Sequence, residues 1–197
     1  MKNKSVYVAA FVLILIAQWY VPAQMISEHE DVAANGKVLK FKTAPVDPYD
    51  AFRGKYIILN FKENKGKITK ETKALNYGDA IFVTFTDSAG YALVGAVLAD
   101  EPKDTSVYVK AKVDYIDNNA FLLNSKVKRP MVFIHINYPF ERYYMNEKKA
   151  PKAETAYQES NRETKNNVYA QIAIKNGVGV VKDVLIDNKS IKDYVVK

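Results

Sequence analysis

The sequence predicts a mainly β body with about one surface helix, attached to an N-terminal transmembrane helix. Three observations lead to this fold class. A long apolar run follows two lysines at the N-terminus, most of the remaining chain alternates β-branched or aromatic runs with turn signals, and one segment after residue 149 has a helical composition. We expect a sandwich or barrel-like body, built as one unit or as two small β units.

Residues 6–26 predict a transmembrane anchor, because these 21 residues come close to the roughly 20 that a spanning helix needs. The two lysines of the preceding basic tip, residues 1–5, are expected to stay in the cytoplasm, while Trp19 and Tyr20 suit the far membrane interface. We therefore expect a single-pass inner (cytoplasmic) membrane protein with its N-terminus inside and its C-terminal body in the periplasm.

Two other interpretations of the apolar run stay open. A cleaved signal peptide has the same basic start, and Val21-Pro22-Ala23 resembles a cleavage site, so the body would be secreted after cleavage near Ala23. A buried core helix would show one apolar stripe, whereas this run is apolar on all faces. We favour the retained anchor because the apolar character outlasts a typical signal-peptide core.

The extracytoplasmic body, residues 37–197, follows a polar stalk at 27–36. Turn signals divide the body into successive strands. Strands are expected near residues 37–44, 55–63, 79–86, 91–99, 106–116, 120–125, 131–138 and 168–175, with two more near 178–186 and 191–196. Residues 150–165 are rich in Ala, Glu, Gln and Lys and predict the surface helix, with Pro151 in its first turn.

Composition excludes several kinds of site. The chain has no cysteine, which excludes disulfides, thiolate nucleophiles and cysteine metal clusters. The formal charge of +7 comes mostly from lysine, and the four arginines are scattered, so we expect no nucleic-acid binding. His29 and His135 are interpreted as a solvated stalk residue and a half-exposed strand residue, so we expect no metal site and no cofactor.

Residues 45–61 read PVDPYDAFRGKYIILNF and predict a turn that leads into a strand. Asp47 and Asp50 offer acceptors for a turn that Pro48 presets, and Gly54 can end the turn in the left-handed conformation. Beyond it, alternate side chains face opposite sides of the strand. The residues expected to build this turn and strand are Pro45, Asp47, Pro48, Asp50, Arg53, Gly54, Tyr56, Leu59 and Phe61.

Arg53 has two interpretations. It can pin the corner through an ion pair with Asp47 or Asp50, or it can hold an anion or the carboxylate of a partner. We favour the internal ion pair, because both carboxylates lie within six residues of the guanidinium along the chain.

This stretch resembles the GDYxxLxY-motif family, whose members combine an N-terminal membrane segment with the pattern PVDPxDxxRGDYxxLxY. The chain departs from that pattern at Lys55 and Phe61, which replace the motif aspartate and the final tyrosine. The resemblance continues in YPFERYYMNEKKAPKAE at 138–154 and in VYAQIAIKNGVGVVKDVLIDNK near the end. It implies a membrane-anchored architecture and no particular activity, because the family is functionally uncharacterised.

The sequence holds no recognised catalytic motif, so we expect no enzyme. The first interpretation is a non-enzymatic binding or assembly module for another envelope protein or a polytopic membrane protein. The alternative is an envelope hydrolase or small-ligand-binding domain in which Arg53 acts with Glu147 and Glu154. The candidate binding residues are Arg53, Arg142, Tyr143, Tyr144, Glu147 and Glu154.

Overall fold

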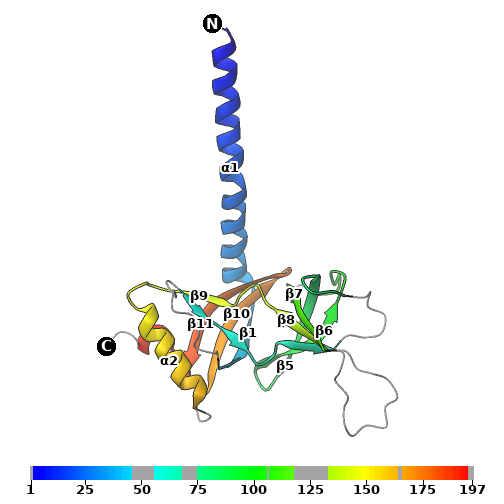
Figure 1. Cartoon of the computed structure of the whole chain (residues 1–197), viewed down its shortest axis with the longest axis vertical. Helices are drawn as coiled ribbons and strands as arrows, with labels where there is room; N and C mark the ends of the chain where they lie inside the picture. Colours follow the sequence, from blue (N-terminus) through cyan, green and yellow to red (C-terminus); the bar gives the residue numbers. More distant parts are fainter. Residues whose placement is uncertain are drawn as a thin grey trace.

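The computed structural model of the protein describes residues 2–45, 56–67, 75–105, 107–117, 133–163 and 166–194, with the backbone alone at residues 2, 3 and 5. A long N-terminal helix projects from a β body (Figure 1). The helices in this part of the chain are α1 (Lys2–Asn35), α2 (Ala150–Arg162) and α3 (Ile191–Tyr194). The strands are β1 (Lys37–Ala44), β2 (Tyr56–Ile58), β3 (Asn60–Phe61), β4 (Lys65–Lys67), β5 (Ala80–Ser88), β6 (Tyr91–Leu98), β7 (Tyr108–Asp117), β8 (Phe133–Asn137), β9 (Arg142–Tyr144), β10 (Val168–Lys175), β11 (Val178–Ile186) and β12 (Lys189–Ser190).

Helix α1 has the length and composition of a membrane-spanning helix. The most apolar window of its Val6–Asn35 part has a mean hydropathy of 1.9, and none of that window is buried against the body. Residues 6–26 are exposed around the whole circumference of the helix. These features agree with the predicted single-pass anchor.

The predicted stalk, residues 27–36, continues α1 and ends on the body. Val32 is buried, and Lys175 Nζ donates to the Asp31 carboxylate at 2.7 Å in an ion pair. Gly36 N donates to Val32 O at 2.8 Å, and a Cβ at Gly36 would lie 2.4 Å from that same oxygen. The helix is therefore packed directly onto β10 and β11.

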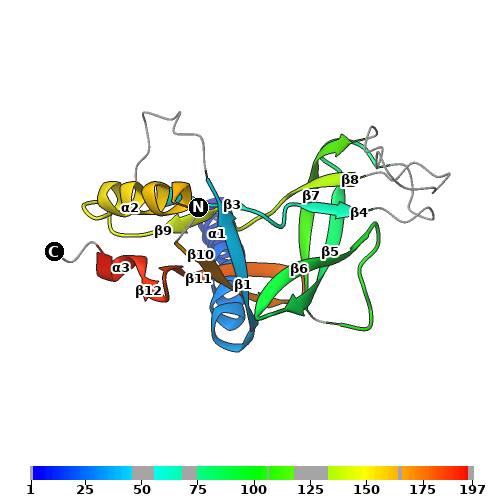
Figure 2. The same ribbon diagram turned by 90° about the horizontal axis from the view of Figure 1, so that it is seen from below.

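Two five-stranded antiparallel sheets and one two-stranded pair make up the described body (Figure 2). The first sheet has the order β12-β11-β10-β1-β3, the second has the order β4-β8-β7-β5-β6, and β2 pairs with β9. The prediction of a mainly β body is confirmed, and β1, β10 and β11 have the predicted bounds. The register of β1 on β10 places Phe41 opposite Ala170, so the central strands bury a continuous apolar face.

One core joins the two sheets, because five aromatic rings meet between them. Phe41 comes from β1 in the first sheet and Phe85 from β5 in the second, and their ring centroids lie 5.1 Å apart in an edge-to-face arrangement. Such pairs add roughly 0.5–1.5 kcal/mol beyond the burial of the rings. The two β units that the sequence allowed therefore share a core. The aromatic cluster consists of Phe41, Phe61, Phe85, Tyr138 and Phe140.

Helix α2 confirms the predicted surface helix, although it ends at Arg162. Pro151 lies in the first turn, where its missing N–H would have no partner within the helix. The opposite, polar face is exposed (Figure 2 shows α2 along one side of the body). Its buried face repeats every three or four residues and consists of Ala150, Ala153, Tyr157 and Ser160.

The strand expected at 55–63 is divided at Leu59. Before this residue β2 pairs with β9, and after it β3 pairs with β1. Leu59 N donates to Glu141 O at 2.7 Å, so the chain changes its partner strand without losing a backbone hydrogen bond. The alternation of side chains runs on through this point and gives no local sign of the change.

The prediction of a strand at 191–196 is wrong, because Ile191–Tyr194 form the short helix α3. Ser190 Oγ accepts a hydrogen bond from Lys192 N at 3.3 Å, which favours a helical turn at this position. Ile191 is buried on the body. The strand expected at 120–125 lies outside the described residues, and no sequence signal predicted the short strands β4, β9 and β12.

Candidate functional site

The two sequence blocks that carry the family resemblance pair with each other. Strand β2 belongs to the PVDPYDAFRGKYIILNF stretch and β9 belongs to the second block. Their antiparallel register places Tyr56 opposite Tyr144, Ile57 opposite Tyr143, and Ile58 opposite Arg142. Segments more than eighty residues apart in the sequence thus form one pair of strands with an outward and an inward face, which we call the β2–β9 pair.

The outward face of the β2–β9 pair carries Tyr56, Arg142 and Tyr144, which we call the aromatic–arginine patch. The Tyr56 and Tyr144 ring centroids lie 5.6 Å apart. The guanidinium carbon of Arg142 lies 5.0 Å from the Tyr56 ring centroid, within cation–π distance. A hydrogen bond that Arg142 donates to the Tyr144 hydroxyl oxygen raises the pKa of Arg142 further, so the guanidinium stays charged. Tyr144 is 65% exposed, and Arg142 is exposed as well.

The inward face of the β2–β9 pair is fixed to the core. Tyr143 is 4% exposed, and its hydroxyl donates to Asp183 Oδ1 at 3.0 Å. Ser190 Oγ donates to the same carboxylate oxygen at 3.0 Å, and Val184 N donates to it at 2.9 Å. Burial, together with the nearby Asp183 charge, raises the pKa of Tyr143. These contacts attach β9 to β11 and β12 and hold the outward face in position.

The later residues of the motif serve the core. Leu59 and Phe61 are buried, and Phe61 joins the aromatic cluster with its ring centroid 5.5 Å from that of Phe140. A phenylalanine suits this position because a tyrosine hydroxyl there would need a hydrogen-bond partner. Pro45 is exposed, and its carbonyl oxygen accepts a hydrogen bond from Asn60 Nδ2 at 3.3 Å.

The structure does not bring all the predicted site residues together. Asp47, Pro48, Asp50, Arg53 and Gly54 lie outside the described residues, so both interpretations of Arg53 stay predictions.

The two predicted carboxylates lie on and beside α2. Glu147 is exposed and precedes the helix. Glu154 lies within the helix and accepts a hydrogen bond from Gln158 Nε2 at 3.2 Å. The convergence of these carboxylates with Arg53 also stays a prediction. No group of three or more potential metal ligands occurs among the described residues.

Glu141 is a candidate that sequence reasoning missed. This half-buried residue lies just before β9, and burial raises the pKa of its carboxyl. The charge of Asp114 adds to the increase, while Arg142 opposes it. Asp114 is the additional residue at a register shift between β7 and β8. The only sequence signal was an acidic residue inside an aromatic run, which does not identify a neighbour on another strand.

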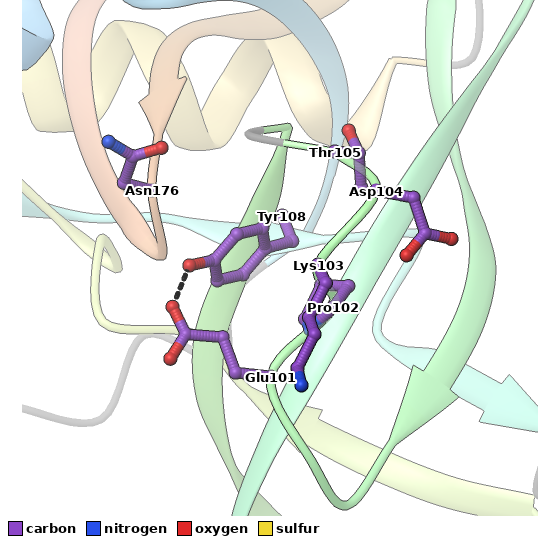
Figure 3. A pocket seen from close by; sticks show the side chains of 7 residues that line it. All are labelled: Glu101, Pro102, Lys103, Asp104, Thr105, Tyr108 and Asn176. Carbon is purple, nitrogen blue, oxygen red and sulfur yellow. Dashed lines mark hydrogen bonds between the residues drawn. The ribbon is translucent and has the colours of Figure 1, made fainter.

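A cleft of about 490 Å³ lies where the β10–β11 turn meets β7 (Figure 3). Gly177 N donates to Tyr108 O at 3.1 Å and Lys110 N donates to Gly177 O at 2.8 Å, which joins the two sheets here. The Tyr108 hydroxyl donates to the Glu101 carboxylate, and this bond raises the pKa of Tyr108 to about 12. Tyr108 therefore stays a neutral hydrogen-bond donor near pH 7 and is not an activated nucleophile.

The sequence model of the GDYXXLXY protein family matches residues 18–184. The matched part runs from within α1 to β11 and includes both strands of the β2–β9 pair. No curated protein and no solved structure matches the chain. Because the family match covers most of the sequence, the chain belongs to the family of GDYXXLXY proteins.

Proposed function

We propose that this chain is a membrane-anchored, non-enzymatic binding or assembly module that contacts another envelope or membrane protein through the aromatic–arginine patch. The observation that carries the proposal is the two-sidedness of the β2–β9 pair. Its inward residues Ile57 and Tyr143 are buried, whereas Arg142 and Tyr144 on the other face are exposed. The residues that resemble the family motif thus build an exposed face on a rigid base.

The chemistry of the patch supports a protein partner. Tyrosine and arginine are enriched among the residues that contribute most to binding at protein interfaces. The Tyr56 ring and the Tyr144 side chain both hold the Arg142 guanidinium, so less side-chain freedom is lost when a partner binds. The planar guanidinium presents several donors in a fixed geometry, which suits a carboxylate or a row of carbonyl oxygens.

The position of the body supports a partner at the membrane. From Ile26 at the end of the apolar run, α1 continues to Asn35, and nine residues at a rise of 1.5 Å make about 14 Å. Because Val32 and Asp31 fasten the helix end to the body, this distance is fixed rather than variable. We place the body in the periplasm from the basic tip of the helix, so the partner is an envelope protein or the periplasmic part of a polytopic membrane protein.

A site-specific photocrosslinker in the full-length chain in native membranes tests the proposal. The crosslinking residue replaces Tyr144 in the patch or, as a control, Tyr77, which is 80% exposed and lies before β5. We expect one discrete adduct of defined mass from position 144 and none from position 77. We also expect Arg142→Ala to reduce the adduct severalfold. Equal crosslinking from both positions, or no adduct at position 144, would overturn the proposal.

A further inference from the structure

A second cleft, of about 490 Å³, opens between the end of β1 and the C-terminal end of α2. We call it the Thr43 cleft, and the lining residues that matter here are Lys42, Thr43, Lys62, Asn161 and Arg162. Its size falls in the range of small-molecule sites, which is roughly 300–1,000 Å³. The β2–β9 pair contributes no residue to it, so the cleft is separate from the aromatic–arginine patch.

The Thr43 cleft is positively charged. Lys42, Lys62 and Arg162 contribute three positive charges, and Glu163 is the single acid among the lining residues, which leaves a formal charge of +2. The Glu163 carboxylate accepts a hydrogen bond from Asn166 Nδ2 at 3.2 Å, so that acid is already engaged within the chain. Three cations around one concave surface attract an anion.

Contacts within the fold position the lysines. Lys62 N donates to Lys42 O at 3.0 Å, so both residues lie side by side where β3 meets β1. The Lys42 ammonium lies 4.5 Å from the Tyr91 ring centroid. Asn167, which also lines the cleft, donates through Nδ2 to the Tyr91 hydroxyl at 2.6 Å. Because Tyr91 comes from the second sheet, both sheets help to fix this side of the cleft.

The floor of the cleft is a buried polar cluster. Thr43 is 2% exposed, and its hydroxyl lies 2.8 Å from Asn161 Oδ1 and 3.1 Å from Val168 O, two acceptors for one proton. Beneath them lies Tyr157, which is 1% exposed; burial raises its pKa to about 12, and the neighbouring Thr43, Asn60 and Asn161 oppose that increase. Within the described residues the Tyr157 hydroxyl has no hydrogen-bond partner. Thr43 and Asn161 thus form the polar floor that an entering molecule meets, and Tyr157 lies below that floor without lining the cleft.

The cleft lies away from the membrane-proximal end of the body. Strand β1 begins at Lys37, directly after α1, and leads away from the helix end (Figure 1). Thr43 is six residues further on, roughly 20 Å along an extended strand. Lipid headgroups of the membrane that holds α1 are therefore out of reach. We propose that the Thr43 cleft binds a soluble small molecule that carries a carboxylate or phosphate group.

Isothermal titration calorimetry of the full-length chain in neutral detergent micelles tests this site. The probes are citrate and inorganic phosphate at constant ionic strength, with soluble short-chain phosphatidylglycerol as a third probe for a lipid source. We expect saturable binding of one citrate or phosphate per chain. Charge-assisted contacts are lost in Lys62→Gln and Arg162→Gln, so each change should raise the Kd about tenfold. The matched control is Lys182→Gln, an exposed residue of β11 outside the cleft, and should change the Kd less than twofold.

Three results would overturn the site. The first is that neither citrate nor phosphate gives saturable binding. The second is that Lys182→Gln weakens binding as much as the cleft variants do, because the attraction is then a property of the whole charged surface. The third is that only the phosphatidylglycerol probe binds, which makes the ligand a lipid. The thermal midpoint of each variant checks its folding, and Lys62→Gln, on an exposed side chain, carries the comparison if Arg162→Gln is destabilised.

Discussion

Two buried tyrosines show how the presence of a hydrogen-bond acceptor decides whether a buried hydroxyl stabilises the fold. The Tyr143 hydroxyl donates to Asp183, whereas the Tyr157 hydroxyl has no hydrogen-bond partner in the described part of the chain. A buried donor without an acceptor costs about 1–3 kcal/mol relative to its hydrated state. The two residues are otherwise alike, because each packs its ring against the same core. The stability of the body is therefore expected to respond in opposite directions to removal of the two hydroxyls.

Tyr157→Phe is predicted to raise the free energy of unfolding by about 1 kcal/mol or more, because it removes an unsatisfied buried donor and keeps the ring. The matched change Tyr143→Phe is predicted to lower it by about 1 kcal/mol, because Asp183 loses one of its donors. Thermal unfolding of the full-length variants in micelles, with no anion added, measures both. A lower midpoint for Tyr157→Phe than for the unchanged chain would contradict the expected sign.

At the scale of elements, the local sequence pattern predicted whether a segment forms a helix or a strand better than it predicted which strand that segment pairs with. Ala150, Ala153 and Tyr157 recur at helical spacing, and α2 buries these residues. The run from Tyr56 to Phe61 alternates like one strand, yet its two halves join different partners. The change of partner depends on Glu141, which is far away in the sequence, and a periodicity of two cannot reveal it.

In the candidate site, too, the contacts between distant segments could not be predicted from the local sequence. The sequence singled out Arg142 and Tyr144 as binding residues, and both are exposed in the aromatic–arginine patch. It did not identify Tyr56 as their neighbour or Asp183 as the acceptor for Tyr143, because these contacts depend on the register of β2 on β9 and on the packing of β9 against β11. The sequence therefore named individual residues, and the fold alone supplied their grouping and buried Tyr143, which the sequence had placed among the candidate binding residues.

The junction between α1 and the body is predicted to depend on Gly36. In Gly36→Ala the new Cβ would lie 2.4 Å from Val32 O and 3.1 Å from Ile174 N. Both are backbone atoms, which can move away only if the helix end or the strand shifts, so we expect the free energy of unfolding to fall by about 1–3 kcal/mol. Limited proteolysis and thermal unfolding of the full-length chain measure it, with cleavage expected to increase near residue 36. Asn35→Ala is the control, because Asn35 is exposed and, in the described part of the chain, its side chain donates across a helical turn to Asp31. A loss as large as that of Gly36→Ala would contradict the close packing.

At the scale of the whole molecule, buried tyrosines hold neighbouring strands around one core. Tyr138 lies in the aromatic cluster and donates to Glu63 O at 2.7 Å, Tyr143 fastens β9 to β11, and Tyr108 lies at the meeting point of the two sheets. Burial raises the pKa of Tyr138, Tyr143, Tyr157 and Tyr169, and the bond to Glu101 raises that of Tyr108. The fold thus requires these phenols in their neutral form.

This requirement predicts a loss of stability at alkaline pH. A phenol whose pKa is raised by folding stabilises the folded state fully below its unfolded pKa of about 10, and loses this contribution as the pH rises through the folded value. For Tyr108 and Tyr157 that value is about 12. We expect the free energy of unfolding to fall between pH 10 and pH 12, with a late tyrosinate absorbance at 295 nm that appears together with the loss of β-sheet circular dichroism. Tyr143→Phe should reduce the late amplitude. Ionisation of all 14 tyrosines in one reversible step, with the circular dichroism unchanged, would contradict a core built on neutral phenols.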